Sequence, residues 1–110
     1  MTRDEAIVEI TRRLIEYSQP ERIFLFGSAA RGDAGPDSDL DFRVVLPDDA
    51  PETAYKAGVH RALWGVGTAA DVVRWPASDF ERYAAHVKSS LPSIIVREGR
   101  LLYDARPIEA

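Results

Sequence analysis

The sequence predicts a single α/β domain over residues 1–110, with a small mixed sheet and helices packed on one of its faces. Short apolar runs typical of strands alternate along the chain with amphipathic stretches at helical spacing. Turn residues separate these segments, and no repeat or low-complexity tract interrupts them. With 110 residues, 45% of them hydrophobic, the chain can bury one core but not two.

The first helix is predicted to begin at Thr2, because Thr2 and Glu5 form a capping-box pattern. It should end before Pro20. Its apolar stripe consists of Ile7, Ile10, Leu14 and Tyr17.

The second half of the chain predicts further helices around one strand. After a polar break at 47–51, a second helix carries the stripe Val59, Ala62, Leu63 and Val66 and stops near Gly65 or Gly67. Beyond a strand around Asp71, Ser78 is expected to cap a helix with the buried stripe Phe80, Tyr83, Ala84 and Val87. Pro92 suits the first turn of a last helical piece, which ends at Gly99.

A strand at 22–26 leads directly into Gly27 and Ser28. A glycine at the end of a strand lets a ligand approach the main chain, and a serine adds a hydroxyl beside free amides. Residues 29–31 favour helix, so a short helix should begin at Ser28 with its positive end toward an anion. This pattern is typical of a turn that holds phosphate.

A second strand, 39–46, places Asp39, Asp41 and Arg43 on one face. Two carboxylates this close would repel each other unless a cation lay between them. Mg²⁺ with oxygen ligands and bound phosphate fits best. Asp71 lies in another strand-like run, 69–75, and if the two strands are neighbours the three carboxylates converge, enough to hold two divalent ions. Asp71 would also suit the base that receives a proton from an attacking hydroxyl.

Each of these residues also has a purely structural interpretation. Asp39 suits a turn, and Asp71 suits an ion pair with Arg43 or Arg74. Arg31 is either a surface cation or a ligand for a triphosphate. Arg43 would either pair with Asp41 and compete with metal, or help to neutralise phosphate.

The segments 26–32, 38–41 and 71–73 together resemble a minimal nucleotidyltransferase of the polymerase-β superfamily. The segment 94–104 is similar to the helix, glycine stop and short strand with which such domains end. The resemblance spans nearly the whole chain, and it implies the polymerase-β-like nucleotidyltransferase fold.

Chains of this size resemble the antitoxins of HEPN/MNT toxin–antitoxin modules, which implies transfer of AMP from ATP to a tyrosine hydroxyl of a helical HEPN ribonuclease toxin. By this resemblance Gly27, Ser28 and Arg31 bind the nucleotide. Asp39, Asp41 and Asp71 bind two Mg²⁺ and perform the catalysis.

Two other functions stay open. In the first, the protein is a nucleotidyltransferase whose acceptor is a small hydroxylated molecule such as an aminoglycoside. In the second, it is a non-catalytic antitoxin that neutralises its partner by binding. Larger relatives carry an additional substrate-binding domain, for which 110 residues leave no room, so the acceptor is expected to come from outside or from a dimer mate.

Composition excludes some partners. A net charge of −4 argues against broad binding of DNA or RNA. Cysteine is absent, and no apolar run approaches a membrane span or a signal segment, so we expect a cytoplasmic protein. His60 and His86 are expected on solvated helix faces, and Trp64 at the rim of a helix or facing a partner.

Overall fold

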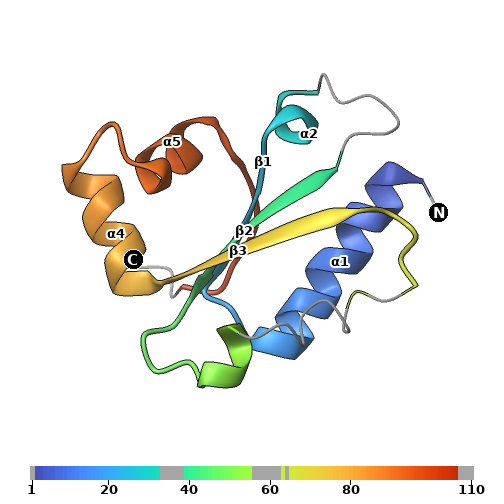
Figure 1. Ribbon diagram of the computed structural model, residues 1–110, viewed down its shortest axis with the longest axis horizontal. Helices are drawn as coiled ribbons and strands as arrows, with labels where there is room; N and C mark the ends of the chain where they lie inside the picture. Colours follow the sequence, from blue (N-terminus) through green and yellow to red (C-terminus); the bar gives the residue numbers. More distant parts are fainter. Residues whose placement is uncertain (1, 33–38, 56–62, 64, 107–110) are drawn as a thin grey trace.

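The computed structural model describes residues 2–32, 39–55, 63 and 65–106. The predicted α/β class is confirmed (Figure 1). In chain order the elements are α1 (Arg3–Ser18), β1 (Arg22–Phe26), α2 (Ser28–Arg31), β2 (Leu40–Leu46), the 3₁₀ helix η1 (Glu52–Tyr55), β3 (Ala70–Pro76), α4 (Ala77–His86), α5 (Leu91–Glu98) and β4 (Arg100–Asp104).

The four strands form one mixed sheet in the order β3-β2-β1-β4. Strand β1 is antiparallel to both β2 and β4, whereas β2 and β3 run parallel. The register pairs Phe26 with Asp41 across β1 and β2, and Asp41 with Asp71 across β2 and β3. Paired residues of neighbouring strands share a face, so Phe26, Asp41 and Asp71 belong to the same face of the sheet.

Helix α1 packs on the opposite face. The predicted capping box at Thr2 is formed, and the chain leaves the helix at Gln19 in a left-handed conformation with φ 47°. Ile7, Ile10 and Leu14 of α1 join one buried cluster with the sheet residues Ile23, Leu25, Leu40, Phe42, Val44 and Leu46. Tyr17, the last member of the predicted stripe, is 37% exposed because the buried side of the helix continues from Leu14 to Ser18 instead.

Helices α4 and α5 cover part of the face that carries Asp41, so helices lie on both faces rather than on one as expected (Figure 1). Phe80 of α4 and Ile95 of α5 are fully buried against Phe24 of β1 and Val45 of β2. The reason is that β1 is apolar on both faces, a pattern that demands cover on each side. Asp41 and Arg43 lie outside this second cluster, so their part of the face stays partly open.

Two expectations for α4 are wrong. The helix begins at Ala77, without a side-chain cap of its own, and Ser78 lies inside it. The backbone N–H of Ser78 instead donates to Oδ1 of Asp48 at 2.9 Å, so an aspartate distant in sequence satisfies the first turn. Of the predicted stripe only Phe80 is buried, whereas Tyr83 and Val87 are 44% and 40% exposed.

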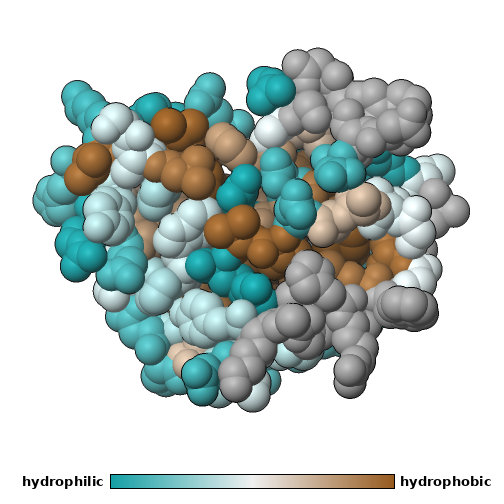
Figure 2. Space-filling view, viewed as in Figure 1, coloured by the Kyte–Doolittle hydropathy of each residue, from teal (hydrophilic) through white to brown (hydrophobic). Residues whose placement is uncertain are grey.

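Apolar groups reach the surface in other places as well. Figure 2 shows apolar surface in the middle of its view, with hydrophilic residues above it and to its lower left. Val73 of β3, an edge strand, is 38% exposed. In the described part of the chain, no helix has the length and apolar character needed to cross a membrane.

The helix expected around Val59 and Ala62 lies outside the described residues, as do His60 and Trp64. His86 is exposed in the last turn of α4, as expected of a solvated histidine.

Candidate functional site

The sheet register brings two of the predicted carboxylates side by side. Asp41 is the second residue of β2, and its partner in the parallel ladder is Asp71 of β3. Neighbouring strands lie about 4.8 Å apart, so both carboxylates start from adjacent backbone positions on one face. Asp71 is exposed, and the Asp41 side chain is 32% exposed. Both can therefore be reached from solvent.

Gly27 brings the turn after β1 into close contact with Asp41. Its φ is +78°, a left-handed conformation that glycine adopts without strain. A Cβ added at this position would lie 3.1 Å from Oδ2 of Asp41, closer than ordinary packing allows. Only glycine leaves both the turn and this carboxylate in place, which gives a physical reason for glycine at this position.

The remaining predicted residues lie near this contact along the chain. Helix α2 begins at Ser28, as predicted, and the N–H of Arg31 donates to the carbonyl of Gly27 at 3.2 Å. Arg31 itself is exposed, and the role expected for the Ser28 hydroxyl lies outside what the structure describes. Asp39 is exposed immediately before β2. The motif thus extends from the end of β1 to the start of β2.

Arg43 pairs with Asp41. Its Nη2 lies 3.3 Å from Oδ1 of Asp41, and its guanidinium carbon lies 5.5 Å from the centre of the Phe26 ring. The Arg43 side chain is 15% exposed, and its buried Nε has no hydrogen-bond partner in the described structure. Of the two roles considered for Arg43, the ion pair is therefore the one formed, and the alternative pairing of Arg43 with Asp71 is not.

The three carboxylates do not converge as strongly as expected. Among the described residues, no three acidic or histidine side chains come together closely enough to hold a metal ion unaided. Asp41 is instead paired with Arg43, and Asp39 and Asp71 are exposed. The oxygen donors still suit Mg²⁺, which is commonly bound by one or two carboxylates together with the phosphates of a substrate.

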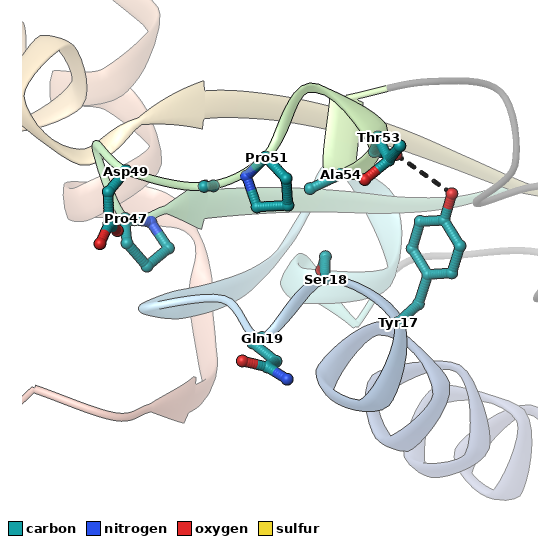
Figure 3. Close-up of a pocket in the computed structure, with 9 residues that line it drawn as sticks. Tyr17, Ser18, Gln19, Pro47, Asp49, Pro51, Thr53 and Ala54 are labelled. Carbon is teal, nitrogen blue, oxygen red and sulfur yellow. Dashed lines mark hydrogen bonds between the residues drawn. The ribbon is translucent and has the colours of Figure 1, made fainter.

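A cavity of about 310 Å³ lies at the other end of β2 (Figure 3). Tyr17 and Ser18 of α1 line it together with Pro47, Pro51 and Thr53, and the Tyr17 hydroxyl donates to the Thr53 carbonyl at 3.1 Å. Pro47 is six residues along the chain from Asp41, a distance of about 20 Å in a strand. The cavity is therefore separate from the carboxylates.

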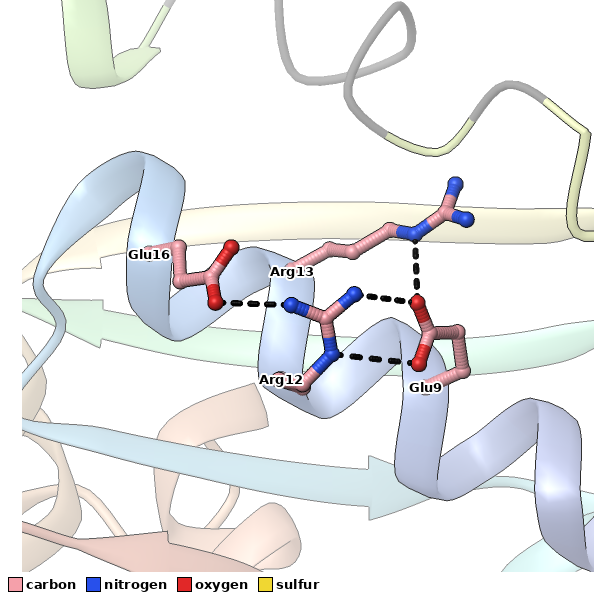
Figure 4. Close-up of polar contacts among 4 residues, drawn as sticks. All are labelled: Glu9, Arg12, Arg13 and Glu16. Atoms are coloured by element: carbon pink, nitrogen blue, oxygen red, sulfur yellow. Dashed lines mark hydrogen bonds and ion pairs between the residues drawn. The ribbon is translucent and has the colours of Figure 1, made fainter.

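The charged side chains on the outside of α1 satisfy one another. Arg12 bridges Glu9 and Glu16, with 2.7 Å between its Nη1 and Oε1 of Glu16, and Nε of Arg13 lies 2.9 Å from Oε1 of Glu9 (Figure 4). Hydrogen bonds from both arginines lower the pKa of Glu9 to about 2. Spacings of three and four residues are typical of a solvated helix surface, so these charges need no functional explanation.

Sequence reasoning missed Phe26 as part of the site. Its ring supports the Arg43 guanidinium, and its backbone pairs with Asp41. The apolar run 22–26 carries no sign of which residues face the carboxylates, because that depends on the register across the connection from Gly27 to Asp39. The sequence feature that could have identified Phe26 as part of the site is its position directly before Gly27.

Comparisons with known proteins concern the fold and the domain family. A crystal structure described as "the toxin-antitoxin with AMP-PNP" matches with a TM-score of 0.57 and 19% identity, over 96% of this chain and 76% of that one. At this identity the likeness concerns the fold, which is the polymerase-β-like nucleotidyltransferase fold. A search of curated proteins gave no match. The family model for the nucleotidyltransferase domain matches residues 6–102, so this chain belongs to the nucleotidyltransferase domain family.

Proposed function

We propose that this protein transfers AMP from ATP to a hydroxyl group of a partner protein, and that the partner is a helical HEPN-type ribonuclease toxin for which it is the antitoxin. Membership of the nucleotidyltransferase domain family supports the reaction class. The neighbour's description, a toxin-antitoxin with AMP-PNP, supports the class of partner and nucleotide. The observation that carries the proposal is the pairing of Asp41 with Asp71 beside the open backbone of Gly27.

In the proposed reaction, the acceptor hydroxyl oxygen forms a bond to the α-phosphorus of ATP. The bond from that phosphorus to the oxygen bridging the α- and β-phosphates breaks, and pyrophosphate leaves. Asp71 is exposed beside Asp41 and receives the proton of the acceptor hydroxyl. The acceptor is a tyrosine of the toxin.

Asp39 and Asp41 would hold Mg²⁺ through carboxylate oxygens, with Asp71 completing the set for two ions. The bound ions would neutralise charge on the phosphates and orient them for in-line attack. The backbone of Gly27 carries no side chain, which lets the triphosphate approach, and Arg31 at the end of α2 faces solvent, where it can meet phosphate.

The acceptor comes from outside the chain in this proposal. The cavity at the far end of β2 is about 20 Å from Asp41 by strand rise, too far to hold an acceptor for attack at the carboxylates. We propose that the protein acts in the cytoplasm, where ATP is available. Self-association is compatible with the proposal and not required by it.

The test is an incubation with Mg²⁺ and the protein encoded in the neighbouring reading frame, using ATP labelled at the α- or the γ-phosphorus in parallel. The partner should become labelled with ATP carrying the label at the α-phosphorus and not with ATP carrying it at the γ-phosphorus, because nucleotidyl transfer retains only the α-phosphate. Label from γ-ATP would show phosphoryl transfer and contradict the proposal. The Asp39→Asn/Asp41→Asn variant should give neither label.

The two competing functions predict other results in the same experiment. An enzyme for small hydroxylated molecules would consume ATP with an aminoglycoside and without any partner protein. A purely steric antitoxin would neutralise its toxin equally well as the Asp39→Asn/Asp41→Asn variant without nucleotide. Either result would overturn protein adenylylation.

A further inference from the structure

Arg43 occupies an unusual position for a residue beside candidate metal ligands. It lies two residues after Asp41 on the same strand face, with Nη2 3.3 Å from Oδ1 of Asp41. Phe26 supports the guanidinium from β1, at 5.5 Å. Because arginine keeps its proton in proteins, this positive charge is permanent.

The surface of α4 carries a comparable pair in a different setting. Arg82 lies 3.0 Å from Asp79 and 5.2 Å from the ring of Tyr83, but its side chain is 62% exposed, against 15% for Arg43. An exposed pair exchanges readily with water, whereas burial makes the charge of Arg43 felt more strongly at its carboxylate. The Arg82–Asp79 pair is therefore a matched control within the same molecule.

The buried Nε of Arg43 adds a second point. It has no acceptor among the described residues, and an unsatisfied buried donor destabilises the state in which it occurs. A bound anionic group would supply an acceptor for the guanidinium. Among the described residues the Arg43 guanidinium has one hydrogen-bond acceptor, Asp41, and donors left for another.

We propose that Arg43 is a positioning residue that serves as the resident counter-cation of Asp41 and makes divalent-ion binding depend on nucleotide. Without nucleotide, the guanidinium holds the Asp41 carboxylate in place and repels a metal ion. When the nucleotide enters, its phosphates provide negative charge for both cations and an acceptor for the guanidinium. The proposal rests on the proposed function in one respect, that Asp41 is a metal ligand.

The size of the effect follows from Coulomb repulsion between the guanidinium and a divalent ion at the carboxylate with which it already pairs at 3.3 Å. The two charges of the ion double this repulsion, whereas contact with water screens it. We therefore expect removal of the Arg43 charge to tighten nucleotide-free metal binding by about tenfold.

The experiment titrates Mn²⁺ into the protein and measures free Mn²⁺ by electron paramagnetic resonance, with and without AMP-PNP. It compares wild type with Arg43→Met, which keeps an apolar stem against Phe26, and with Arg43→Lys, which keeps the charge. Arg82→Met is the matched control, and Asp41→Asn removes the proposed ligand. Thermal unfolding establishes that each variant is folded.

Arg43→Met should bind Mn²⁺ about tenfold more tightly without AMP-PNP, and the gain in affinity that AMP-PNP brings should shrink by the same factor. Arg43→Lys and Arg82→Met should behave as wild type. Unchanged nucleotide-free affinity in Arg43→Met, or an equal gain in Arg82→Met or in Arg43→Lys, would overturn the role of Arg43. If Asp41→Asn binds Mn²⁺ as wild type does, with and without AMP-PNP, the metal role of Asp41 fails and the proposed function with it.

Discussion

Replacing Gly27 with alanine separates the backbone requirement of the turn after β1 from its contact with Asp41. Gly27 has φ +78°, and an added Cβ would lie 3.1 Å from Oδ2 of Asp41. Gly32 has the same φ of +78°, and an added Cβ there meets no described atom within 4 Å. Gly32→Ala is therefore a control for the backbone cost alone.

The expected magnitudes follow from these geometries. A residue with a Cβ in the left-handed region costs about 1–2 kcal/mol, of which reduced freedom of the unfolded chain offsets about 0.4–1 kcal/mol. Gly32→Ala should thus destabilise the protein by about 1 kcal/mol. Gly27→Ala should cost about 2–3 kcal/mol, because the contact with Asp41 adds to the same backbone cost.

The rate of nucleotidyl transfer should differ between the two variants more than their stabilities do. Arg43 holds Oδ1 of Asp41 at 3.3 Å, so a methyl group pressing on Oδ2 must turn the carboxylate or lengthen the ion pair. Misplacement of a catalytic group by about 1 Å costs roughly a hundredfold in rate. The displacement needed here is smaller, so we expect Gly27→Ala to lose about tenfold in transfer rate.

Urea unfolding gives the stabilities, and the rate of label transfer from α-labelled ATP to the partner gives the activity. Gly32→Ala should lose stability and keep its transfer rate within about threefold, whereas Gly27→Ala should lose both. Equal losses of stability and rate in the two variants would show that the approach of Gly27 to Asp41 has no consequence, and would refute the reasoning.

Two further predictions concern stability. Phe80→Ala should destabilise the protein by about 3–5 kcal/mol in urea unfolding. Phe80 is fully buried, and its ring centre lies 5.8 Å from that of Phe24 and 5.7 Å from that of Trp75. A loss of stability below about 1 kcal/mol would contradict this packing. Glu9→Gln should lower the melting temperature at pH 7, because Arg12 and Arg13 hold the pKa of Glu9 at about 2, below its ordinary 4.5. A lowered folded-state pKa stabilises above the unfolded pKa, so the difference between wild type and Glu9→Gln should be complete above pH 4.5 and vanish as the pH falls toward 2. A difference that stays constant over this pH range would exclude the ion pairs as its cause.

Local signals predicted the elements of the fold well, since they act within a few residues. The capping box at Thr2 forms as expected, and α5 has Pro92 in its first turn and ends at Gly99, as predicted. The extent to which α4 is buried was predicted wrongly. The apolar stripe through Phe80, Tyr83 and Val87 identifies one side of the helix, but the extent of the sheet decides how much of that side is buried.

For the candidate site, the sequence indicated which residues to consider but not which contacts they make. The spacing from Gly27 to Asp41 indicates the turn and the carboxylates, and the alternation of β2 places Arg43 on their face. The close approach of Gly27 to Asp41 and the support of Arg43 by Phe26 depend on the sheet register. That register is set by packing over the whole sheet, which no short segment encodes.

The intact mass of the partner protein tests the central claim most directly. The protein from the neighbouring reading frame is incubated with ATP, Mg²⁺ and either the wild type or the Asp39→Asn/Asp41→Asn variant, which changes charge and keeps shape. The wild type should raise the partner's mass by one or more AMP units on a tyrosine, and the variant should leave it unchanged. An unmodified partner with the wild type, or equal modification by both proteins, would contradict carboxylate-dependent nucleotidyl transfer.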